Sequence, residues 1–301
     1  MADLRGRRVL VTGSTGFVGR AVVARLVREE ALVHVVSRRE LPPEKGVQAW
    51  RADLTDTAAV RRLVAGAAPE AILHLAAQTS AARTEAMIAD TFTANLQASL
   101  AVLTAAMGTG ARVVLAGSLE APAPEVPAPV PTSPYAASKW AAAGYARMFT
   151  ALFGVPTVDL RIAMVYGPAQ PDERKVLPYS VLALLAGTPP ELTAGTREVD
   201  WVYVDDVADA VLAAAVAPGV EGRSFDVGTG VATTIRGVVE QVAGIVGNGT
   251  VPRFGAAPAR PLDGTLRADP RAAAADLGWR ARVELAEGLR RTVEFYRARQ
   301  S

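Results

Sequence analysis

The stretch Val9-Leu10-Val11-Thr12-Gly13-Ser14-Thr15-Gly16-Phe17-Val18-Gly19 decides the fold of this 301-residue chain. An apolar run without helical period, over residues 7–12, is typical of a parallel strand that is buried on both faces. Beyond it, Val18, Val22 and Leu26 recur every four residues with arginines between them, which predicts a helix that packs one face on a sheet. The stretch therefore predicts a strand, a glycine turn and a helix.

The turn itself is interpreted as a dinucleotide site. Gly13, Gly16 and Gly19 would let backbone N–H groups approach a pyrophosphate, and the N-terminus of the following helix adds partial positive charge. The spacing is Gly-x-x-Gly-x-x-Gly and differs from the more common Gly-x-Gly-x-x-Gly fingerprint. An ordinary tight strand–helix turn is the alternative.

The second strand, residues 31–37, ends in Ser37-Arg38-Arg39. An acidic residue at this point accepts hydrogen bonds from the ribose of NAD, whereas arginine accommodates the 2′-phosphate of NADP. Arg38 and Arg39 therefore favour NADP(H), with NAD(H) as the alternative cofactor. Because arginine is abundant in this chain, a pair of solvated arginines that binds no cofactor is the alternative explanation.

Two further strands are predicted over residues 47–51 and 71–75. Asp53 follows the first and can accept a hydrogen bond from the adenine amino group, while Asp56 is the better candidate for the N-cap of the next helix. His74 lies inside the apolar run of the second strand and is interpreted as a packed core histidine.

Tyr135 and Lys139 are one turn apart on a helix that starts after Pro134, with Ser133 as a possible cap. A phenol is a poor acid–base catalyst near pH 7, but a neighbouring ammonium and an oxidised nicotinamide would lower its pKa. The pair therefore predicts a proton donor beside a cofactor.

A fifth strand over residues 111–116 leads into Ser118, at the strand end where ligands bind in doubly wound sheets. Ser118 can donate a hydrogen bond to a substrate oxygen beside Tyr135, or it can simply form a turn. Residues 121–134 carry five prolines between 122 and 131 and predict an extended loop beside the substrate.

Composition narrows the function classes. The net charge is +2, half of the residues are apolar, and there are no cysteines and only two histidines. These values argue against a nucleic-acid-binding surface, disulfides, thiolate chemistry and a zinc site. With no signal peptide or membrane-spanning stretch, we expect a soluble cytoplasmic protein.

Together these motifs resemble the extended short-chain dehydrogenase/reductase family, especially its sugar-nucleotide epimerases, dehydratases and 4-ketoreductases. The resemblance runs along nearly the whole chain, from the glycine turn to Asp276-Leu277-Gly278-Trp279. It implies an α/β fold with a Rossmann-type doubly wound parallel sheet and a smaller C-terminal α/β substrate lobe.

The resemblance also assigns site residues. It implies that Ser118, Tyr135 and Lys139 form the catalytic triad, with Glu120 as a further candidate acid. The implied cofactor contacts are Gly13, Thr15, Gly16, Phe17, Val18, Gly19, Arg38, Arg39, Asp53, Leu54, Leu75, Ala76, Ala77, Asn95, Tyr135, Lys139 and Ile162. The implied substrate contacts are Ser80, Met164, Arg197 and Arg260, and no metal is implied.

Three positions depart from the family pattern. Met164 replaces the usual Asn of L-R-x-x-N-x-Y-G-P, and Val199 replaces the Arg that usually precedes the Asp of R-D-F-x-x-V-D-D. Arg260 matches a second phosphate-binding arginine, and Arg197 could stand in for the lost one. Leu119 follows Ser118 where many family dehydratases carry the Asp of an Asp-Glu pair, which weakens a dehydratase assignment.

These observations favour an NADP(H)-dependent oxidoreductase that reduces a keto group, at C4, of a nucleotide-linked deoxysugar. A 4-epimerase or 4,6-dehydratase with the same triad is the alternative, and a non-catalytic cofactor-sensing regulator is the alternative from another class. We expect a dinucleotide domain over 1–166 plus about 197–230, and a substrate lobe over about 167–196 plus 231–301. The family resemblance also implies a homodimer through the helix near 90–106 and the helix of Tyr135, which presents Ala136, Trp140, Ala143, Arg147 and Phe149.

Overall fold

The computed structural model describes residues 3–80, 82–123, 129–258 and 262–300. Its main feature is a sheet of seven parallel strands in the order β10-β6-β5-β4-β1-β2-β3. The order reverses between β1 and β4, so the chain winds outward in both directions from β1, as in a Rossmann-type fold. The strands are β1 (Arg8–Thr12), β2 (Leu32–Ser37), β3 (Val47–Arg51), β4 (Ala71–His74), β5 (Arg112–Ser118), β6 (Thr157–Ile162) and β10 (Arg223–Val227).

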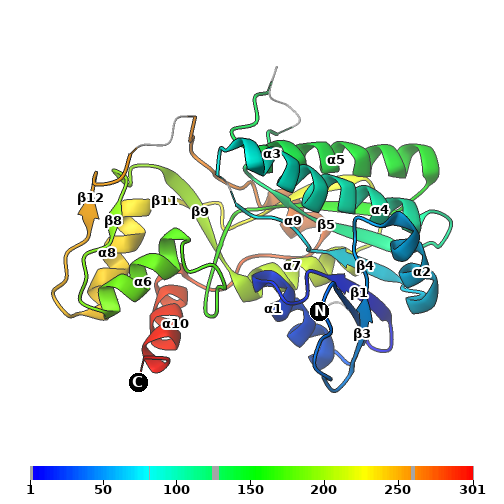
Figure 1. The fold of residues 1–301 in the computed structure, drawn as a ribbon, viewed down its shortest axis with the longest axis horizontal. Helices are drawn as coiled ribbons and strands as arrows, with labels where there is room; N and C mark the ends of the chain where they lie inside the picture. Colours follow the sequence, from blue (N-terminus) through cyan, green and yellow to red (C-terminus); the bar gives the residue numbers. More distant parts are fainter. Residues whose placement is uncertain (1–2, 81, 124–128, 259–261, 301) are drawn as a thin grey trace.

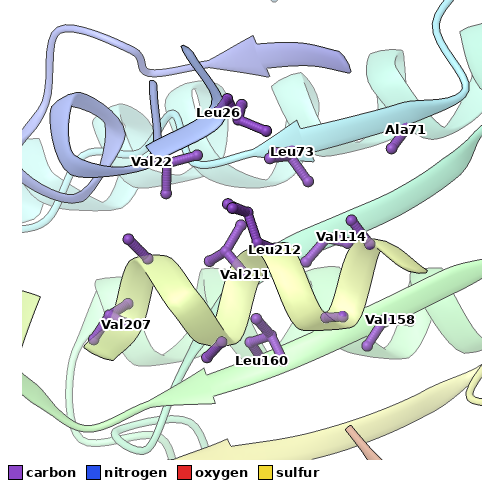
Figure 2. Close-up of a cluster of buried hydrophobic side chains, with 14 of the residues drawn as sticks. Val22, Leu26, Ala71, Leu73, Val114, Val158, Leu160, Val207, Val211 and Leu212 are labelled. Atoms are coloured by element: carbon purple, nitrogen blue, oxygen red, sulfur yellow. The ribbon is translucent and has the colours of Figure 1, made fainter. Parts of the chain in front are cut away.

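Helices cover both faces of this sheet (Figure 1). On one face, α1 (Phe17–Arg28) and α7 (Val204–Val216) bury an apolar cluster against β1, β4, β5 and β6. Figure 2 shows Val207, Val211 and Leu212 of α7 pointing into this cluster. The other face carries α2 (Thr57–Ala67), α4 (Ala98–Ala106) and α5 (Pro134–Phe153), which enclose a second cluster. The doubly wound α/β fold expected from the sequence is therefore confirmed.

A smaller group of elements follows β6 and contains its own apolar cluster. A three-stranded sheet, in the order β11-β9-β7, lies in this region with the α6, α8 and α10 helices (Figure 1). The elements are β7 (Met164–Tyr166), α6 (Val176–Leu185), β8 (Glu191–Leu192), β9 (Glu198–Tyr203), β11 (Ala232–Thr234), α8 (Ile235–Val246), β12 (Arg253–Phe254) and α10 (Leu285–Ala298). The short helix α9 (Arg271–Asp276) instead contacts β10, and its Ala273 belongs to the cluster under α1 and α7. The exact domain boundaries given above stay a prediction.

Two buried aspartates hold this part of the chain together. Asp200 accepts hydrogen bonds from the backbone N–H groups of Thr229 and Gly230 at 2.9 and 2.7 Å. Asp206 accepts from the N–H groups of Arg282 and Val283 at 3.1 and 2.9 Å. Since each carboxylate satisfies backbone donors of distant loops, the segment 200–206 has a structural role.

The first five strands lie within two residues of the ranges expected from the sequence, but a π-helical segment was not expected. The helix expected near 90–106 is divided into α3 (Glu85–Thr91), the π-helix η1 (Phe92–Gln97) and α4. Such π-segments occur frequently at functional sites. In this chain η1 contains Asn95, one of the residues assigned to the cofactor site.

Candidate active site

The Tyr135–Lys139 pair lies at the start of α5, as expected. The Ser133 hydroxyl accepts a hydrogen bond from the Ala136 N–H at 3.1 Å, and Pro134 occupies the first turn. This cap begins the helix one residue before the tyrosine, so both side chains share one face. Lys139 is buried and Tyr135 is half-buried.

Ser118 is the last residue of β5 and is brought next to Tyr135. It is buried, it is hydrogen-bonded to the Tyr135 side chain, and it pairs in register with Ile162 at the end of β6. The Ser118 hydroxyl also accepts from the Glu120 N–H at 3.1 Å. The structure thus brings Ser118, Tyr135 and Ile162 together at the carboxyl edge of the sheet.

The ammonium of Lys139 is directed at the backbone of β5. Its Nζ donates to the Ala116 carbonyl oxygen at 2.6 Å and lies 5.9 Å from the centroid of the Tyr135 ring. Burial lowers the pKa of Lys139 to about 8. The nearby Asp159 carboxylate opposes that shift.

The lowering of the tyrosine pKa by an ammonium together with an oxidised nicotinamide stays a prediction, and the residues of the chain itself act in the opposite direction. Burial raises the pKa of Tyr135 to about 12, the hydrogen bond from Ser118 opposes this, and the charge of Glu120 adds to it. The reason is that desolvation of the phenolate, the largest cause, outweighs the stabilising hydrogen bond from Ser118. In this structure Tyr135 is therefore a neutral phenol and a proton donor at neutral pH.

The glycine turn leaves no room for side chains where the turn meets the end of β4. A Cβ on Gly13, whose φ is +69°, would lie 2.6 Å from the Ala76 nitrogen. A Cβ on Gly19 would lie 2.0 Å from the Gly13 carbonyl oxygen. Both glycines are required by close backbone packing, whatever ligand the turn holds.

The same turn offers unfilled hydrogen-bonding groups. The side-chain oxygen of Ser14 is buried without a partner in the described part of the chain. The N-cap of α1 is Gly16, which has no side chain to cap the helix, and the first turn contains no acidic residue. An anion such as a pyrophosphate would satisfy both features, so the residues present fit a dinucleotide. Of the other assigned turn residues, Thr15 is exposed, and Phe17 and Val18 pack on the cluster of the smaller region.

The end of β2 places two arginines in solvent. Arg38 and Arg39 are exposed, and the Arg39 N–H donates to the Ser37 hydroxyl at 3.1 Å. Asp53 accepts from the N–H and the hydroxyl of Thr55 at 2.9 and 2.8 Å, so it forms a local turn. These bonds, with the charge of Arg38, lower the pKa of Asp53. Arg38 and Asp53 therefore lie near one another at this strand end, and Leu54 packs on the core beside them.

Asp56 and His74 have the structural roles predicted for them. The Asp56 carboxylate caps α2 by accepting from the N–H groups of Ala58 and Ala59. His74 is buried, with its Nδ1 2.9 Å from the Thr12 hydroxyl and its Nε2 3.0 Å from the Ser99 hydroxyl. Burial, with the charge of Lys139, lowers the pKa of His74 to about 3.

Asn95 connects the loop after β4 to the catalytic helix. Its Oδ1 accepts from the Gln78 N–H at 2.7 Å, and its Nδ2 donates to the Gln78 carbonyl at 3.1 Å and to the Ser138 hydroxyl at 2.8 Å. The side chain is fully buried. Asn95 thereby positions the segment that contains Leu75, Ala76 and Ala77, whose role as cofactor contacts stays a prediction.

Charged residues from four segments meet beside the site. Arg197 approaches Glu120 at 3.8 Å and Asp263 at 3.5 Å, and Asp263 also pairs with Arg83 at 2.6 Å. The sequence analysis did not include Arg83 or Asp263. Their charge and their positions in loops could have marked them as candidate site residues in the sequence, but only the fold brings them together.

The remaining substrate candidates are less closely grouped. Ser80 lies in the loop after β4, where its hydroxyl accepts from the Ala82 N–H at 3.3 Å. Met164 is on β7 and packs against the cluster of the smaller region. Arg260 lies outside the described residues.

The described residues contain neither a group of three or more metal-ligating side chains nor a helix long and apolar enough to cross a membrane. A doubly wound sheet, a glycine turn suited to a pyrophosphate, and a Ser–Tyr–Lys arrangement at the carboxyl edge define a class. This is the class of enzymes that transfer hydride with a nicotinamide dinucleotide.

The comparisons with known proteins identify the family within that class. Residues 9–228 match the NAD dependent epimerase/dehydratase family, and the chain belongs to it. It is 35% identical to a UDP-glucose 4-epimerase of Mycolicibacterium smegmatis, over 96% of this chain and 98% of that protein. It is 28% identical to a dTDP-glucose 4,6-dehydratase of the same organism, over 98% and 94%.

Solved structures of epimerases share the fold. The UDP-glucose 4-epimerase of Thermotoga maritima with UDP-glucose is 29% identical with a TM-score of 0.88, over 97% of this chain and 99% of that one. The UDP-glucose 4-epimerase of Thermus thermophilus in complex with NAD is 34% identical with a TM-score of 0.83, over 96% and 99%. The protein is thus an enzyme of the extended short-chain dehydrogenase/reductase type with an NAD(P)-type cofactor.

Proposed function

We propose that the protein is an NADPH-dependent reductase that acts on a keto group, at C4, of a nucleotide-linked deoxysugar. The observation that carries this proposal is the end of β2, where Arg38 and Arg39 stand in solvent and Ser37 takes the place of a carboxylate. Two guanidiniums there suit a 2′-phosphate, whereas the ribose diol of NAD needs an acceptor. Use of NADPH is typical of net reduction.

The state of Tyr135 supports the same direction of reaction. When bound, a nicotinamide cofactor supplies the hydride. Tyr135, with its pKa raised to about 12, holds the proton that the carbonyl oxygen must receive, and Ser118 hydrogen-bonds the same oxygen. Lys139, buried one turn further on, holds positive charge next to the phenol and could reach ribose hydroxyls.

The substrate is proposed from charge and from the relatives. Arg83 and Arg197 are brought together through Asp263, and their guanidiniums could exchange these carboxylates for the diphosphate of a nucleotide sugar. UDP-glucose is bound in the Thermotoga maritima structure. We therefore assign Arg197, Ser80, Met164 and Arg260 to the substrate side, as the sequence indicated.

A 4-epimerase is the second candidate function, and one observation favours it. The relative at 35% identity over nearly the full length of both chains is a UDP-glucose 4-epimerase. A dehydratase is less well supported, although dehydratases are among the relatives. Leu119 is buried and Glu120 faces Arg197, so the two positions after Ser118 do not supply the Asp-Glu pair of the family's dehydratases.

A cofactor assay separates these functions. We expect a 4-keto-6-deoxy sugar nucleotide to consume one NADPH per product, measured as loss of absorbance at the nicotinamide band, with NADH as the cofactor control. Turnover of a fully hydroxylated sugar nucleotide without added cofactor would instead establish epimerisation or dehydration, because those reactions regenerate their own cofactor.

A homodimer stays part of the proposal, but its expected surface changes. Ala136, Ala143 and Phe149 are buried in the chain's own fold, so the face first expected on α5 is largely taken. Ile88 and Phe92, 60% and 54% exposed, lie beside a groove between α3 and α5 and form a better contact surface. Light scattering on the wild type and on Phe92→Glu tests this, and a monomeric wild type at micromolar concentration would contradict it.

The cytoplasmic location stays a prediction.

A further inference from the structure

The strand β6 carries an unusual pattern for the interior of a parallel sheet. Val158, Leu160 and Ile162 face the apolar cluster under α7, but the residues between them include Asp159 and Arg161. Successive side chains of a strand point to opposite faces, so both charged residues face α5. Asp159 is only 5% exposed.

The Asp159 carboxylate is enclosed by residues of the two neighbouring strands. Gly117, on the neighbouring strand, has no side chain, and a Cβ there would lie 2.4 Å from the Asp159 carboxylate oxygen. The Ser224 side chain hydrogen-bonds the carboxylate from the other side, on β10. The glycine therefore provides the space into which the carboxylate fits.

Asp159 and Lys139 line the same small cavity. Its volume is about 10 Å³, room for roughly one water molecule, and it is bordered by Ser118 and by the two charged side chains. The other charged groups around it are Arg147 of α5 and Arg161 of β6. Arg161 is in turn paired with Asp226 of β10 at 3.0 Å, which leaves Asp159 as the carboxylate that faces Lys139.

We propose that Asp159 is a positioning residue that keeps the buried ammonium of Lys139 charged. Lys139 is desolvated, and its one direct hydrogen-bond acceptor in the described residues is the neutral Ala116 carbonyl. A buried charge needs an opposite charge close by, or it loses its proton. Asp159 supplies that charge from β6, across the cavity that both side chains line.

The direction of the effect follows from the two pKa values. Burial lowers the pKa of Lys139 to about 8, and Asp159 raises it. Burial raises the pKa of Asp159 to about 6, while Ser224 and the charges of Lys139, Arg161 and Arg147 lower it. Between about pH 6 and pH 8 both groups are charged, and removal of the carboxylate charge would make Lys139 lose its proton at lower pH.

The experiment measures Lys139 directly. The chain has three lysines, Lys45, Lys139 and Lys175, so NMR of ¹³C,¹⁵N-lysine-labelled protein resolves each side chain. In Asp159→Asn we expect the pKa of Lys139 to fall by about one pH unit or more, the size of shift that a nearby opposite charge causes. Lys45 and Lys175 serve as internal controls. Asp209→Asn, on α7, breaks the partly buried pair with Arg25 of α1 and controls for the loss of a carboxylate.

A measurement on the wild type covers the case in which Asp159→Asn does not fold. The Lys139 resonance should show a second inflection near pH 6, where Asp159 titrates, and the other two lysines should not. An unchanged Lys139 pKa in Asp159→Asn, or no inflection in the wild type, would overturn the proposal.

Only the expected effect on the rate of turnover rests on the proposed function. If Lys139 must be charged during turnover, the alkaline limb of the pH–activity profile should move to lower pH in Asp159→Asn together with the NMR pKa. A shifted Lys139 pKa with an unshifted activity profile would support the Asp159 proposal and count against the assigned role of Lys139.

Discussion

Two parts of the site differ in how the chain supports them. Around Tyr135 and Lys139 the side chains are desolvated, hydrogen-bonded and shifted in pKa. At the end of β2, Arg38 and Arg39 are exposed, and their position depends only on where the strand ends. Burial magnifies electrostatic effects and water screens them. We therefore expect large, pH-dependent effects in the first region and smaller, salt-dependent effects in the second.

The largest effect is expected for Tyr135→Phe. The substitution removes the proton donor and keeps the ring, so turnover should fall by roughly 10²- to 10⁴-fold, the range typical for loss of an acid–base catalyst. Affinity for the cofactor, measured by calorimetry, should change little. Tyr145→Phe is the matched control, because Tyr145 lies on the same helix with 41% of its surface exposed. Near-wild-type turnover of Tyr135→Phe would remove the tyrosine from the mechanism.

The next effect concerns the stability of the buried region at low pH. His74 stays neutral in the folded protein down to a pKa of about 3, whereas the unfolded chain binds a proton near 6.5. The unfolded state therefore binds more protons between these values, and the free energy of unfolding should fall as pH falls through this window. Each pKa unit corresponds to about 1.36 kcal/mol, so the loss is on the order of a few kcal/mol.

The contribution of His74 to the pH dependence of the free energy of unfolding has to be separated from the contribution of Asp159. The raised pKa of Asp159 acts in the opposite sense, because the folded protein takes up that proton first, below about pH 6. Urea unfolding of the wild type and of His74→Asn across pH 4 to 7 isolates the histidine by difference. The variant should lose part of the slope, and equal slopes would show that His74 contributes nothing to acid sensitivity.

Features that depend on neighbouring residues could be predicted from the sequence, whereas features that depend on residues far apart in the chain could not. The glycine turn, the cap at Ser133 and the core role of His74 follow from local pattern, and the structure contains each of them. Local pattern is sufficient there because a strand, a turn and a helix cap are fixed by neighbouring residues.

The rest depends on residues far apart in the chain. Asn95 reaches Gln78 and Ser138 from a π-helix, which no hydrophobic periodicity in the sequence predicts. Asp159 lies near Lys139 only because β6 pairs with β5. The raised pKa of Tyr135 is likewise a consequence of burial. One sequence signal was available, since alternation of Asp159 and Arg161 with apolar residues is unusual in a strand buried on both faces.

The smallest effect is expected at the end of β2. If Arg38 and Arg39 hold a 2′-phosphate, changing both to Ala should weaken NADPH binding by about tenfold or more and leave NADH binding nearly unchanged. Charge-assisted hydrogen bonds contribute about 1.5–3 kcal/mol each, and exposure reduces that value. The loss should therefore shrink at high salt, because the guanidiniums are solvated.

A second pair of exposed arginines makes the control. Arg61 and Arg62 of α2 are also adjacent and exposed, so changing both to Ala alters the net charge equally without touching the end of β2. Calorimetry with both cofactors at two salt concentrations should show a selective loss of NADPH affinity only for the Arg38/Arg39 variant. Equal losses for NADPH and NADH, or tighter binding of NADH by the wild type, would mean that these arginines are surface charge and that the enzyme uses NAD. Such a result would favour the epimerase, since a cofactor regenerated in each turnover does not have to be drawn from the NADPH pool.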